Sequence, residues 1–482
     1  MRENLIQRRS ILKQAAFGLT SLVAGDLAAL PDFLSNPAES STKPGKKGFV
    51  HRGYLGWITD LATQPDPKAT WPSIRLDEQL LRDYDHTFGL MQKLGFNEIS
   101  IWGLYVAYDW PLDIKSAVTP KRGAMVERLI DAAHKRGIRV YSGLGVYCCG
   151  FDEIIKANPR LSKGNQRVMC PSQSESWRWM EKVVDFVLER FLIDGVSMQS
   201  ADQGRCTCDQ CSVYSDAEYH ALVNVRTSEY IRSRWPHKTI GVNSWGLRFE
   251  APETLPSLLK ISQKVDYLID VHDSSRKQDR NYRKQVIEAL ACDFGTLGGP
   301  QVEPPQHWKR DRWFLPTLKR VGEHLKLLSE EGGRACEYFF HILANPGDEV
   351  SFWLAGKVLS DPQGSWTGHL QDCVEELYQV SKGSTRDALL HLFLEAEEAY
   401  FKHLPPGVCG TISMEPLVSD RPGPPIYLSK RLNAGQRASY AKDLEKIKRE
   451  SGRLISEVAR KDKMRKIAHC VENVLRDIAA VA

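Results

Sequence analysis

The sequence predicts an α/β fold, a (β/α)₈ TIM barrel followed by an all-helical C-terminal subdomain. Over residues 49–345, eight short apolar runs alternate with amphipathic helical patterns, an order typical of a parallel sheet. No Gly-x-Gly-x-x-Gly motif follows any of these runs, which disfavours an open dinucleotide-binding sheet. Beyond residue 345 only helical patterns continue.

Each predicted strand is an apolar run bounded by helix or turn signals. The strands are expected at Phe49–Trp57, Glu98–Trp102, Arg139–Tyr147, Gly195–Ala201, Thr239–Trp245, Asp266–Val271, Cys292–Leu297 and Arg334–His341. The helices between them are expected at 77–94, 122–136, 174–191, 212–234, 254–262, 280–290 and 312–330. In one of these helices, apolar residues recur at helical spacing from Val126 to Ala133, and Gly137 ends the pattern.

The predicted C-terminal subdomain spans residues 346–482. Its helices are expected at 347–360, 365–382, 384–403 and 434–480. The charges of its basic tail, residues 436–482, alternate in sign, which indicates a solvated helix face rather than a binding arm.

The N-terminus resembles a twin-arginine export signal. Arg8 and Arg9 precede an apolar run that is interrupted by Gly18, Gly25 and Asp26, so no stable membrane span is expected. We expect a signal peptide over residues 1–30, a disordered linker over 31–48, and a periplasmic or extracellular location. Because the net charge of +5 sits mainly at the chain ends, the slightly acidic central body argues against nucleic-acid binding. The sequence leaves the oligomeric state open.

Aromatic and polar side chains recur where the predicted strands end. In a barrel these ends form the functional face. Tryptophan rings suit the apolar faces of sugar rings, and polar side chains can bind hydroxyl groups. The predicted substrate-binding residues are Trp57, Trp102, Asn243, Trp245, Asp270 and His272.

Three carboxylates at strand ends are candidates for catalysis. Glycoside hydrolysis needs two carboxyl groups that flank the scissile bond. Asp202 ends a strongly apolar run, and Glu337 lies within an apolar strand, where an unpaired carboxylate is costly. We expect Asp202 to be the general acid and Glu337 or Asp273 to be the second carboxylate. An N-cap or loop role for Asp202 is the alternative.

Four cysteines form a candidate structural site. Cys206, Cys208 and Cys211 are closely spaced, and Cys170 lies at the end of the neighbouring predicted loop. Four thiolates would make a closed zinc site, whereas an oxidising compartment would favour disulfides. Both alternatives pin the loop after Asp202. No cofactor is expected to be required for catalysis.

The stretch from Cys170-Pro-Ser through Asp194-Gly195-Val-Ser to the three cysteines resembles the barrel of the α-glucuronidase and β-hexosaminidase-like glycoside hydrolases. It is most similar to their poorly characterised bacterial branch with a cysteine-rich loop after the fourth strand. The segment from Asn345 to Pro362 is similar to the helical extension in that branch. The resemblance implies hydrolysis of a glycosidic bond. The adjacent Asp-Glu pair of hexosaminidases is absent, because Ala201-Asp202-Gln203 stands there.

The working hypothesis is therefore an exported glycoside hydrolase that acts on a polysaccharide or glycan. One alternative is a sugar or uronate lyase or isomerase with His272 or a tyrosine as its base. Another is a carbohydrate-binding barrel without catalysis. Neither the sugar, the linkage nor the stereochemical outcome follows from the sequence.

Overall fold

The structure is a computed structural model that describes residues 48–58, 76–104, 119–201, 203–244, 247–270, 280–297, 314, 316–339, 346–403 and 432–480. The chain divides into two units, Met1–Lys46 and Lys47–Ala482, and all described residues belong to the second. No helix among the described residues is long and apolar enough to cross a membrane.

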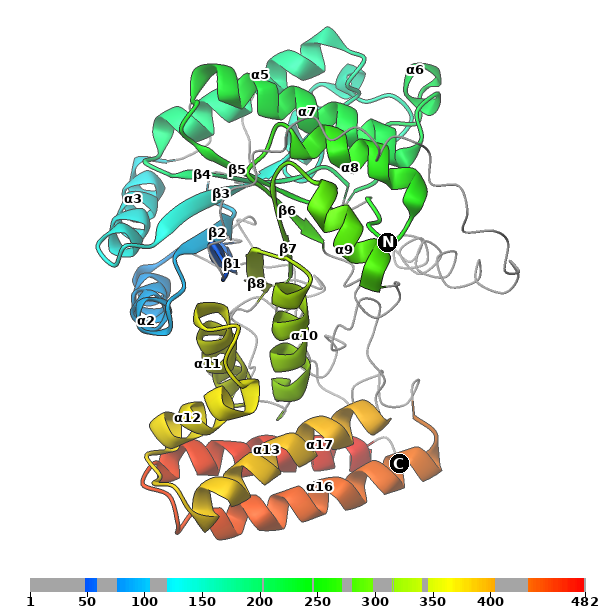
Figure 1. The fold of residues 1–482 in the computed structure, drawn as a ribbon. Coiled ribbons are helices and arrows are strands. Elements are labelled where there is room, and N and C mark those ends of the chain that lie inside the picture. Colours follow the sequence, from blue (N-terminus) through cyan, green and yellow to red (C-terminus); the bar gives the residue numbers. More distant parts are fainter. Residues whose placement is uncertain are drawn as a thin grey trace, which may run out of the picture. The chain divides into compact units, whose positions relative to one another are not determined.

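The second unit contains a closed barrel of eight parallel strands in sequential order (Figure 1). The strands are β1 His51–Trp57, β2 Glu98–Trp102, β3 Arg139–Gly145, β4 Gly195–Gln199, β5 Thr239–Asn243, β6 Tyr267–Asp270, β7 Asp293–Thr296 and β8 Ala335–Phe339. The barrel closes where β1 pairs with β8, with His51 opposite Ala335. All eight predicted strands are confirmed, with ends that differ by a few residues.

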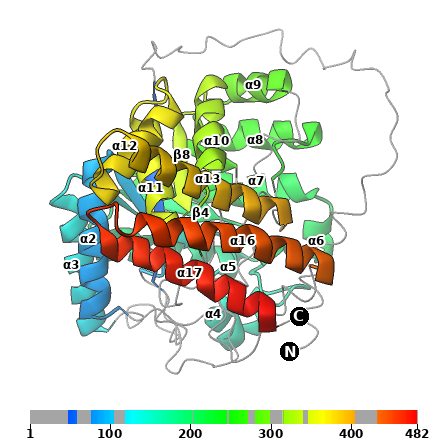
Figure 2. The ribbon, with the colours of Figure 1, turned by 90° about the horizontal axis from the view of Figure 1, so that it is seen from below.

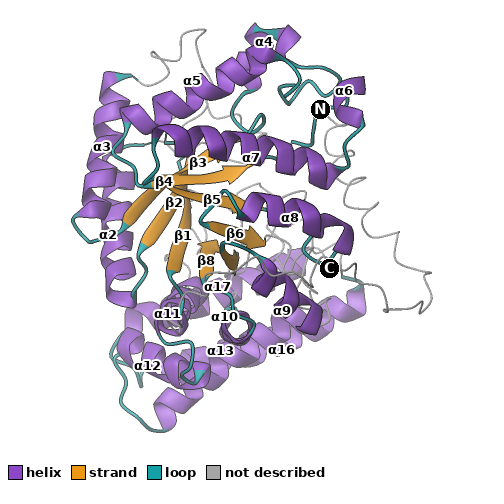
Figure 3. Ribbon diagram, turned by 45° about the horizontal axis from the view of Figure 1, so that its top comes forward, coloured by secondary structure: helices purple, strands orange, loops and turns teal. Residues whose placement is uncertain are grey.

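Helices surround the barrel on its outer side, as Figure 3 shows. They are α2 Glu78–Leu94, α3 Pro120–His134, α4 Asp152–Ala157, α5 Ser174–Arg190, α6 Asp209–Ser212, α7 Asp216–Arg234, α8 Leu255–Ser262, α9 Arg280–Ala289 and α10 Leu318–Glu330. The 3₁₀ turns are η3 Pro159–Leu161 and η4 Pro252–Thr254. The apolar stripe predicted for the second of these helices is confirmed, because Val126, Leu129, Ile130 and Ala133 of α3 are all buried in the core. Such stripes cover the outer faces of the strands.

The C-terminal part is helical, as predicted. It contains α11 Pro346–Ser360, α12 Trp366–Tyr378, α13 Ser384–His403, α16 Ala434–Leu454 and α17 Lys461–Ala480. Helix α11 contacts both α10 and α2, so it occupies the place of the eighth barrel helix. Helices α13, α16 and α17 lie side by side (Figure 2), and α16 contacts both of the others.

Two predicted helices differ in detail from the structure. The helix expected over 212–234 begins later, at Asp216 of α7, since Ser215 caps α7 through a capping box with Glu218; α6 is a separate short helix before it. The helix expected over 434–480 divides into α16 and α17, which pack against each other. Helix α4 and the turn η3 were not expected.

Glu397 ties α13 to the barrel. Its carboxylate accepts hydrogen bonds from the backbone N–H groups of Leu318, Lys319 and Arg320, at 2.8, 2.8 and 3.0 Å. These groups begin α10, where the helix itself leaves N–H groups without partners. A side chain of the C-terminal helices therefore caps a helix of the barrel.

A charged cluster closes the amino end of the barrel interior. The Glu98 carboxylate accepts hydrogen bonds from Arg139 at 2.6 Å and from the Tyr141 hydroxyl at 3.0 Å, and it lies 3.1 Å from His51 Nδ1. Glu98 and His51 are buried. The candidate substrate site is therefore expected at the other end of the barrel, where the strands have their carboxyl ends.

Candidate functional site

The parallel strands bring all eight carboxyl ends to one face of the barrel, where enzymes of this fold carry their active sites. Among the predicted site residues, the structure describes the side chains of Trp102, Asn243, Asp270, Glu337, Cys170, Cys206, Cys208 and Cys211. Trp57 is described only as part of the β1 backbone. Outside the described residues lie Asp202, Trp245, His272 and Asp273.

Trp102 forms the top of the described barrel interior. It is the last residue of β2, is 8% exposed, and packs with Leu55 and Ile269 in the interior apolar cluster. A Cβ atom at Gly143 of β3 would lie only 2.3 Å from the Trp102 ring. The ring therefore takes the space that a side chain on β3 would need, and it forms a flat apolar floor for the candidate site.

Asn243 is the last residue of β5 and is buried at the same end of the barrel. Its Oδ1 atom has no hydrogen-bond partner among the described residues. An unpaired buried amide oxygen is costly in a folded protein. A hydroxyl group of a bound ligand or an ordered water would satisfy it, which suits the role in substrate binding that the sequence predicts.

Glu337 belongs to a polar layer deeper in the barrel. Its Oε1 accepts hydrogen bonds from Ser100 Oγ at 2.8 Å, Ser197 Oγ at 3.0 Å and the Tyr267 hydroxyl at 3.2 Å. These residues come from β8, β2, β4 and β6, and layers built from alternate strands are the rule in TIM barrels. Glu337 Oε2 is buried and has no partner among the described residues. Burial raises the pKa of the Glu337 carboxyl, and the Ser100 and Ser197 hydroxyls oppose this rise.

The strand register places Glu337 below Trp102. Gly53 of β1 pairs with Glu337, whereas Trp57 of β1, nearer the carboxyl end, pairs with Trp102. Glu337 is 1% exposed. Among the described residues, Trp102 thus lies nearer the carboxyl end of the barrel than the Glu337 carboxylate.

Asp270, at the end of β6, faces a helix of the outer layer. Its carboxylate lies 3.7 Å from a guanidinium nitrogen of Arg283 in α9, and the Arg283 Nε donates a hydrogen bond to Glu331 at 2.6 Å. All three residues are buried. The structure therefore separates Asp270 from Asn243 and Trp102 and places it where it fixes α9 against β6.

A buried network that the sequence analysis missed holds the end of β4. The Ser200 Oγ lies 3.0 Å from His220 Nδ1 and accepts a hydrogen bond from Asn224 Nδ2 at 2.9 Å. Burial lowers the pKa of His220 to about 4, so the imidazole is neutral. His220 and Asn224 belong to α7, so the network fixes the direction of the chain just before Asp202. Its only sequence signal is polar residues one turn apart on the buried face of α7.

A tight turn follows β3 at the same face. Tyr147 and Cys149 have φ angles of 61° and 55°, in the left-handed region that non-glycine residues seldom adopt. The Cys149 N–H donates a hydrogen bond to Gln203 Oε1 at 3.1 Å, which connects this turn to the loop after β4. Strained backbone of this kind persists only where its surroundings hold it, and it is frequent near functional sites.

The four predicted cysteines converge on one point. Their Sγ atoms all lie within 4.8 Å of one another, and Cys170 Sγ lies 3.6 Å from Cys208 Sγ and 3.8 Å from Cys211 Sγ. Hydrogen bonds from Cys206 and Ser172 lower the pKa of the Cys170 thiol to about 4. The pKa values of Cys206 and Cys211 are raised, the first by its hydrogen bond to Cys170 and the second by burial. Among the described cysteines all are free thiols.

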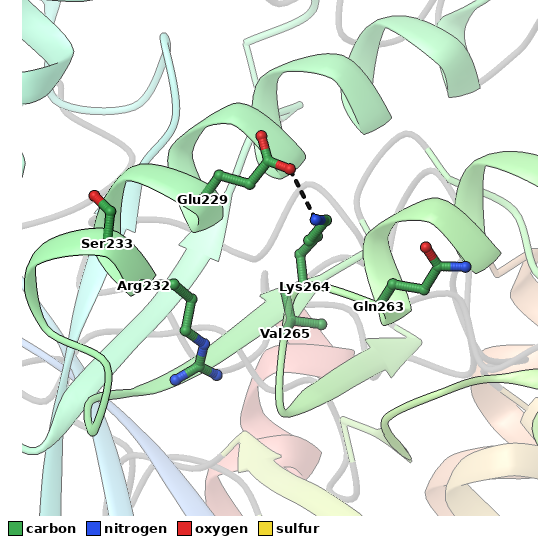
Figure 4. A pocket seen from close by; sticks show the side chains of 6 residues that line it. All are labelled: Glu229, Arg232, Ser233, Gln263, Lys264 and Val265. Atoms are coloured by element: carbon green, nitrogen blue, oxygen red, sulfur yellow. Dashed lines mark ion pairs between the residues drawn. The ribbon is translucent and has the colours of Figure 1, made fainter. Parts of the chain in front are cut away.

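A surface hollow of about 480 Å³ lies at the opposite end of the barrel (Figure 4). Its lining comes from the end of α7 and the segment before β6, and it includes an ion pair of 2.9 Å between Lys264 and Glu229. Segments that lead into the strands support stability in this fold, whereas those that leave the strands carry chemistry. The hollow therefore does not mark the candidate active site.

No protein-family model and no curated protein sequence matches this chain. Among solved structures, it is similar to a GH138 enzyme targeting pectin rhamnogalacturonan II, with a TM-score of 0.56 and 10% identity over 90% of this chain and 57% of that chain. The match thus spans little more than half of that enzyme.

Two further solved structures match less closely. An O-GlcNAc hydrolase mutant of Thermobaculum terrenum gives a TM-score of 0.48 and 12% identity over 88% of this chain and 81% of that one. CpGH84B gives 0.46 and 9% identity over 90% and 68%. At such identities the comparison with the GH138 enzyme establishes fold alone: the chain is a (β/α)₈ barrel with a helical C-terminal part.

Proposed function

We propose that this protein is a glycoside hydrolase that cleaves a glycosidic bond of a polysaccharide or glycan. The observation that carries the proposal is that an aromatic ring, Trp102, and an amide oxygen without a partner among the described residues, Asn243 Oδ1, both lie at the carboxyl end of a closed barrel. Sugar-binding sites combine apolar rings with a few polar groups. Support also comes from the fold shared with a GH138 enzyme targeting pectin rhamnogalacturonan II.

Asp202 is the proposed general acid. It follows the end of β4, whose direction is set by the buried hydrogen bonds of Ser200, His220 and Asn224. A general acid must hold its proton at the leaving oxygen to within hydrogen-bond distance, which requires a fixed loop. The hydrogen bond between Gln203 and Cys149 supports the same loop one residue later.

Asp273 is the proposed second carboxylate. The alternative, Glu337, is buried beneath Trp102, and its Oε1 accepts hydrogen bonds from three hydroxyl groups. It is therefore poorly placed to reach a sugar. A separation of about 5–5.5 Å between the two carboxyl groups would give retention, and about 6.5–9.5 Å would give inversion. Trp57, Trp102 and Trp245 are the proposed sugar platforms, and Asn243 and His272 the further substrate-binding residues. Asp270, which the sequence also suggested, is not included, because its carboxylate lies 3.7 Å from Arg283 of α9.

The proposed location is outside the cytoplasm. Arg8 and Arg9 before an apolar run support export by the twin-arginine route, which carries proteins that are already folded. The chemistry proposed here uses carboxyl groups alone and needs no cofactor.

Turnover of a glycan panel by the purified chain tests the proposal. We expect Asp202→Asn and Asp273→Asn each to lower kcat by about 10²–10⁴-fold, the range for loss of a general acid or base. The matched control is Asp131→Asn, which removes an exposed carboxylate on α3 and should leave turnover unchanged. Full turnover in the Asp202 variant would refute the assignment of the general acid.

The burial of Glu337 also favours a second candidate function, a carbohydrate-binding barrel without catalysis. On that hypothesis its carboxylate serves only to join strands β2, β4, β6 and β8. Binding of glycans without any turnover, and with affinity unchanged in Asp202→Asn, would support this candidate over the hydrolase.

A further inference from the structure

The loop after β4 and the segment before α5 meet at four cysteine side chains. Cys206, Cys208 and Cys211 belong to the loop, and Cys170 belongs to the segment. Cys170, Cys206 and Cys211 are at most 2% exposed, and Cys208 is half-buried. The four sulfur atoms therefore surround one point from which the rest of the chain excludes most solvent.

The distances between the sulfur atoms fit one tetrahedral metal ion. Zinc binds thiolate sulfur at about 2.3 Å, so the edge of a ZnS₄ tetrahedron is about 3.8 Å. Cys170 Sγ lies 3.6 Å from Cys208 Sγ and 3.8 Å from Cys211 Sγ, and no pair within the set exceeds 4.8 Å. A cluster of several metal ions would hold its thiolates farther apart.

The same distances do not describe disulfides. A disulfide bond is about 2.05 Å long and joins sulfurs in one pair, leaving other cysteines outside it. Here Cys170 approaches two different cysteines at nearly equal distances. One sulfur shared equally between two neighbours is the arrangement of ligands around a common centre.

The backbone arranges the cysteines as metal ligands. The Cys208 carbonyl accepts hydrogen bonds from the N–H groups of Cys211 and Ser212, at 2.9 and 2.8 Å, and this turn brings both sulfurs of the Cys-x-x-Cys pair to one side. The Ser172 hydroxyl lies 2.9 Å from Cys170 Sγ, where it can donate a hydrogen bond to a thiolate. Arg205 donates a hydrogen bond to the Cys211 carbonyl at 3.0 Å and is itself held by an ion pair with Asp216 at 2.6 Å. Partners of this second layer orient the ligands.

We infer that Cys170, Cys206, Cys208 and Cys211 bind one Zn²⁺ ion in a closed structural site that fastens the loop after β4 to the segment before α5. Zn²⁺ binds four thiolates, so four Zn–S bonds form and each cysteine that is protonated in the metal-free protein releases its proton. The Cys206 thiol then gives up the hydrogen bond that it donates to the Lys163 carbonyl at 2.9 Å. With four protein ligands, no position remains open for substrate, so this ion takes no part in hydrolysis.

The first test measures metal and thiols in the purified, full-length wild-type protein. We expect about one zinc per chain by elemental analysis, retained after gel filtration, and Co²⁺ substitution should give the intense visible absorption of a tetrahedral thiolate site. After denaturation in chelator without reductant, all eleven cysteines should react as free thiols. Two fewer thiols for every disulfide, together with no bound metal, would overturn the inference. These readouts are independent of activity, so they stand even if the proposed hydrolase function fails.

A matched pair of variants locates the ion. Cys208→Ser removes a half-buried member of the cluster and should abolish stoichiometric zinc, whereas Cys292→Ser, a half-buried cysteine next to β7, should retain it. Hydrogen exchange in residues 203–215 should rise in the first variant and not in the second. Zinc retained in Cys208→Ser, or lost in Cys292→Ser, would refute the assignment. If Cys208→Ser does not fold, the measurements on the wild-type protein still decide.

Discussion

Replacing Glu337 with glutamine tests whether the centre of the barrel is dry. Burial raises the folded-state pKa of the Glu337 carboxyl above its ordinary value of about 4.3. The folded state therefore holds the proton more strongly than the unfolded state. The stability from this difference is complete below about pH 4.3 and is lost as the pH rises through the raised pKa. Glutamine keeps the shape and an acceptor oxygen but does not titrate.

The magnitude follows from the linkage between pKa and stability. Each unit by which the pKa is raised removes about 1.4 kcal/mol from the free energy of unfolding as the pH rises past it. Solvent does not reduce this effect on the free energy of unfolding, because Glu337 is 1% exposed. The glutamine amide also adds donors that no described residue is placed to accept, at a cost of about 1–3 kcal/mol, but this cost does not change with pH. The stability of the wild type relative to the variant should therefore fall with rising pH.

Urea unfolding of both proteins at pH values of about 4, 5.5 and 7 measures this difference. Groups that do not interact with Glu337 titrate alike in both proteins and cancel, so the difference in slope reports Glu337 together with its coupling to Glu98. Asp131→Asn, an exposed substitution on α3, shows the effect of removing one surface charge. Parallel profiles for wild type and Glu337→Gln, within about 0.5 kcal/mol, would refute the reasoning. Glu337 would then be hydrated from the carboxyl face, and it would return as a candidate for the second catalytic carboxylate.

Three further substitutions test the structure around the site by urea unfolding. Gly143→Ala should destabilise the protein by about 1–3 kcal/mol, because the new Cβ would lie 2.3 Å from the Trp102 ring; an unchanged midpoint would place the ring elsewhere. Glu397→Ala should cost about 1–3 kcal/mol, because three backbone N–H groups at the start of α10 lose their acceptor, and wild-type stability would contradict the cap. Asn224→Ala should cost a similar amount by removing the donor to Ser200, and it should speed hydrogen exchange at the end of β4; unchanged exchange would show that the network does not hold this strand.

The fold could be predicted from the sequence because each strand is a local apolar run and each helix a local stripe. The seventh strand, for example, lies at Asp293–Thr296, within the expected Cys292–Leu297. The errors occur where local signals are weak or were overlooked. Ser215 and Glu218 form a capping box that marks the start of α7 in the sequence. The break between α16 and α17 has no comparable signal, because antiparallel packing of the two helices decides it.

The candidate site was less predictable, because it depends on the register between strands. Cys170 could be grouped with the three later cysteines because the loops after β3 and β4 are neighbours in a barrel. The four sulfur atoms do converge. The period of two along β6 left open which of its polar residues faces inward, and the ion contact with Arg283 shows that Asp270 faces a helix. That Glu337 lies below Trp102 follows only from their pairing with β1, which no local pattern encodes.

Glycines at one level of the barrel explain why its floor is aromatic. A Cβ atom at Gly143 would meet the Trp102 ring, and one at Gly241 would lie 2.2 Å from the Tyr267 ring. Strands β3 and β5 therefore leave space that rings on β2 and β6 fill, as alternation of large and small residues requires in a closed barrel. Because Trp102 fills this space above Glu337, a sugar on the carboxyl face meets an aromatic surface before any carboxylate of the strands. The proposed function therefore assigns the acid chemistry to residues that follow the strands, which is the position that Asp202 and Asp273 hold in the sequence.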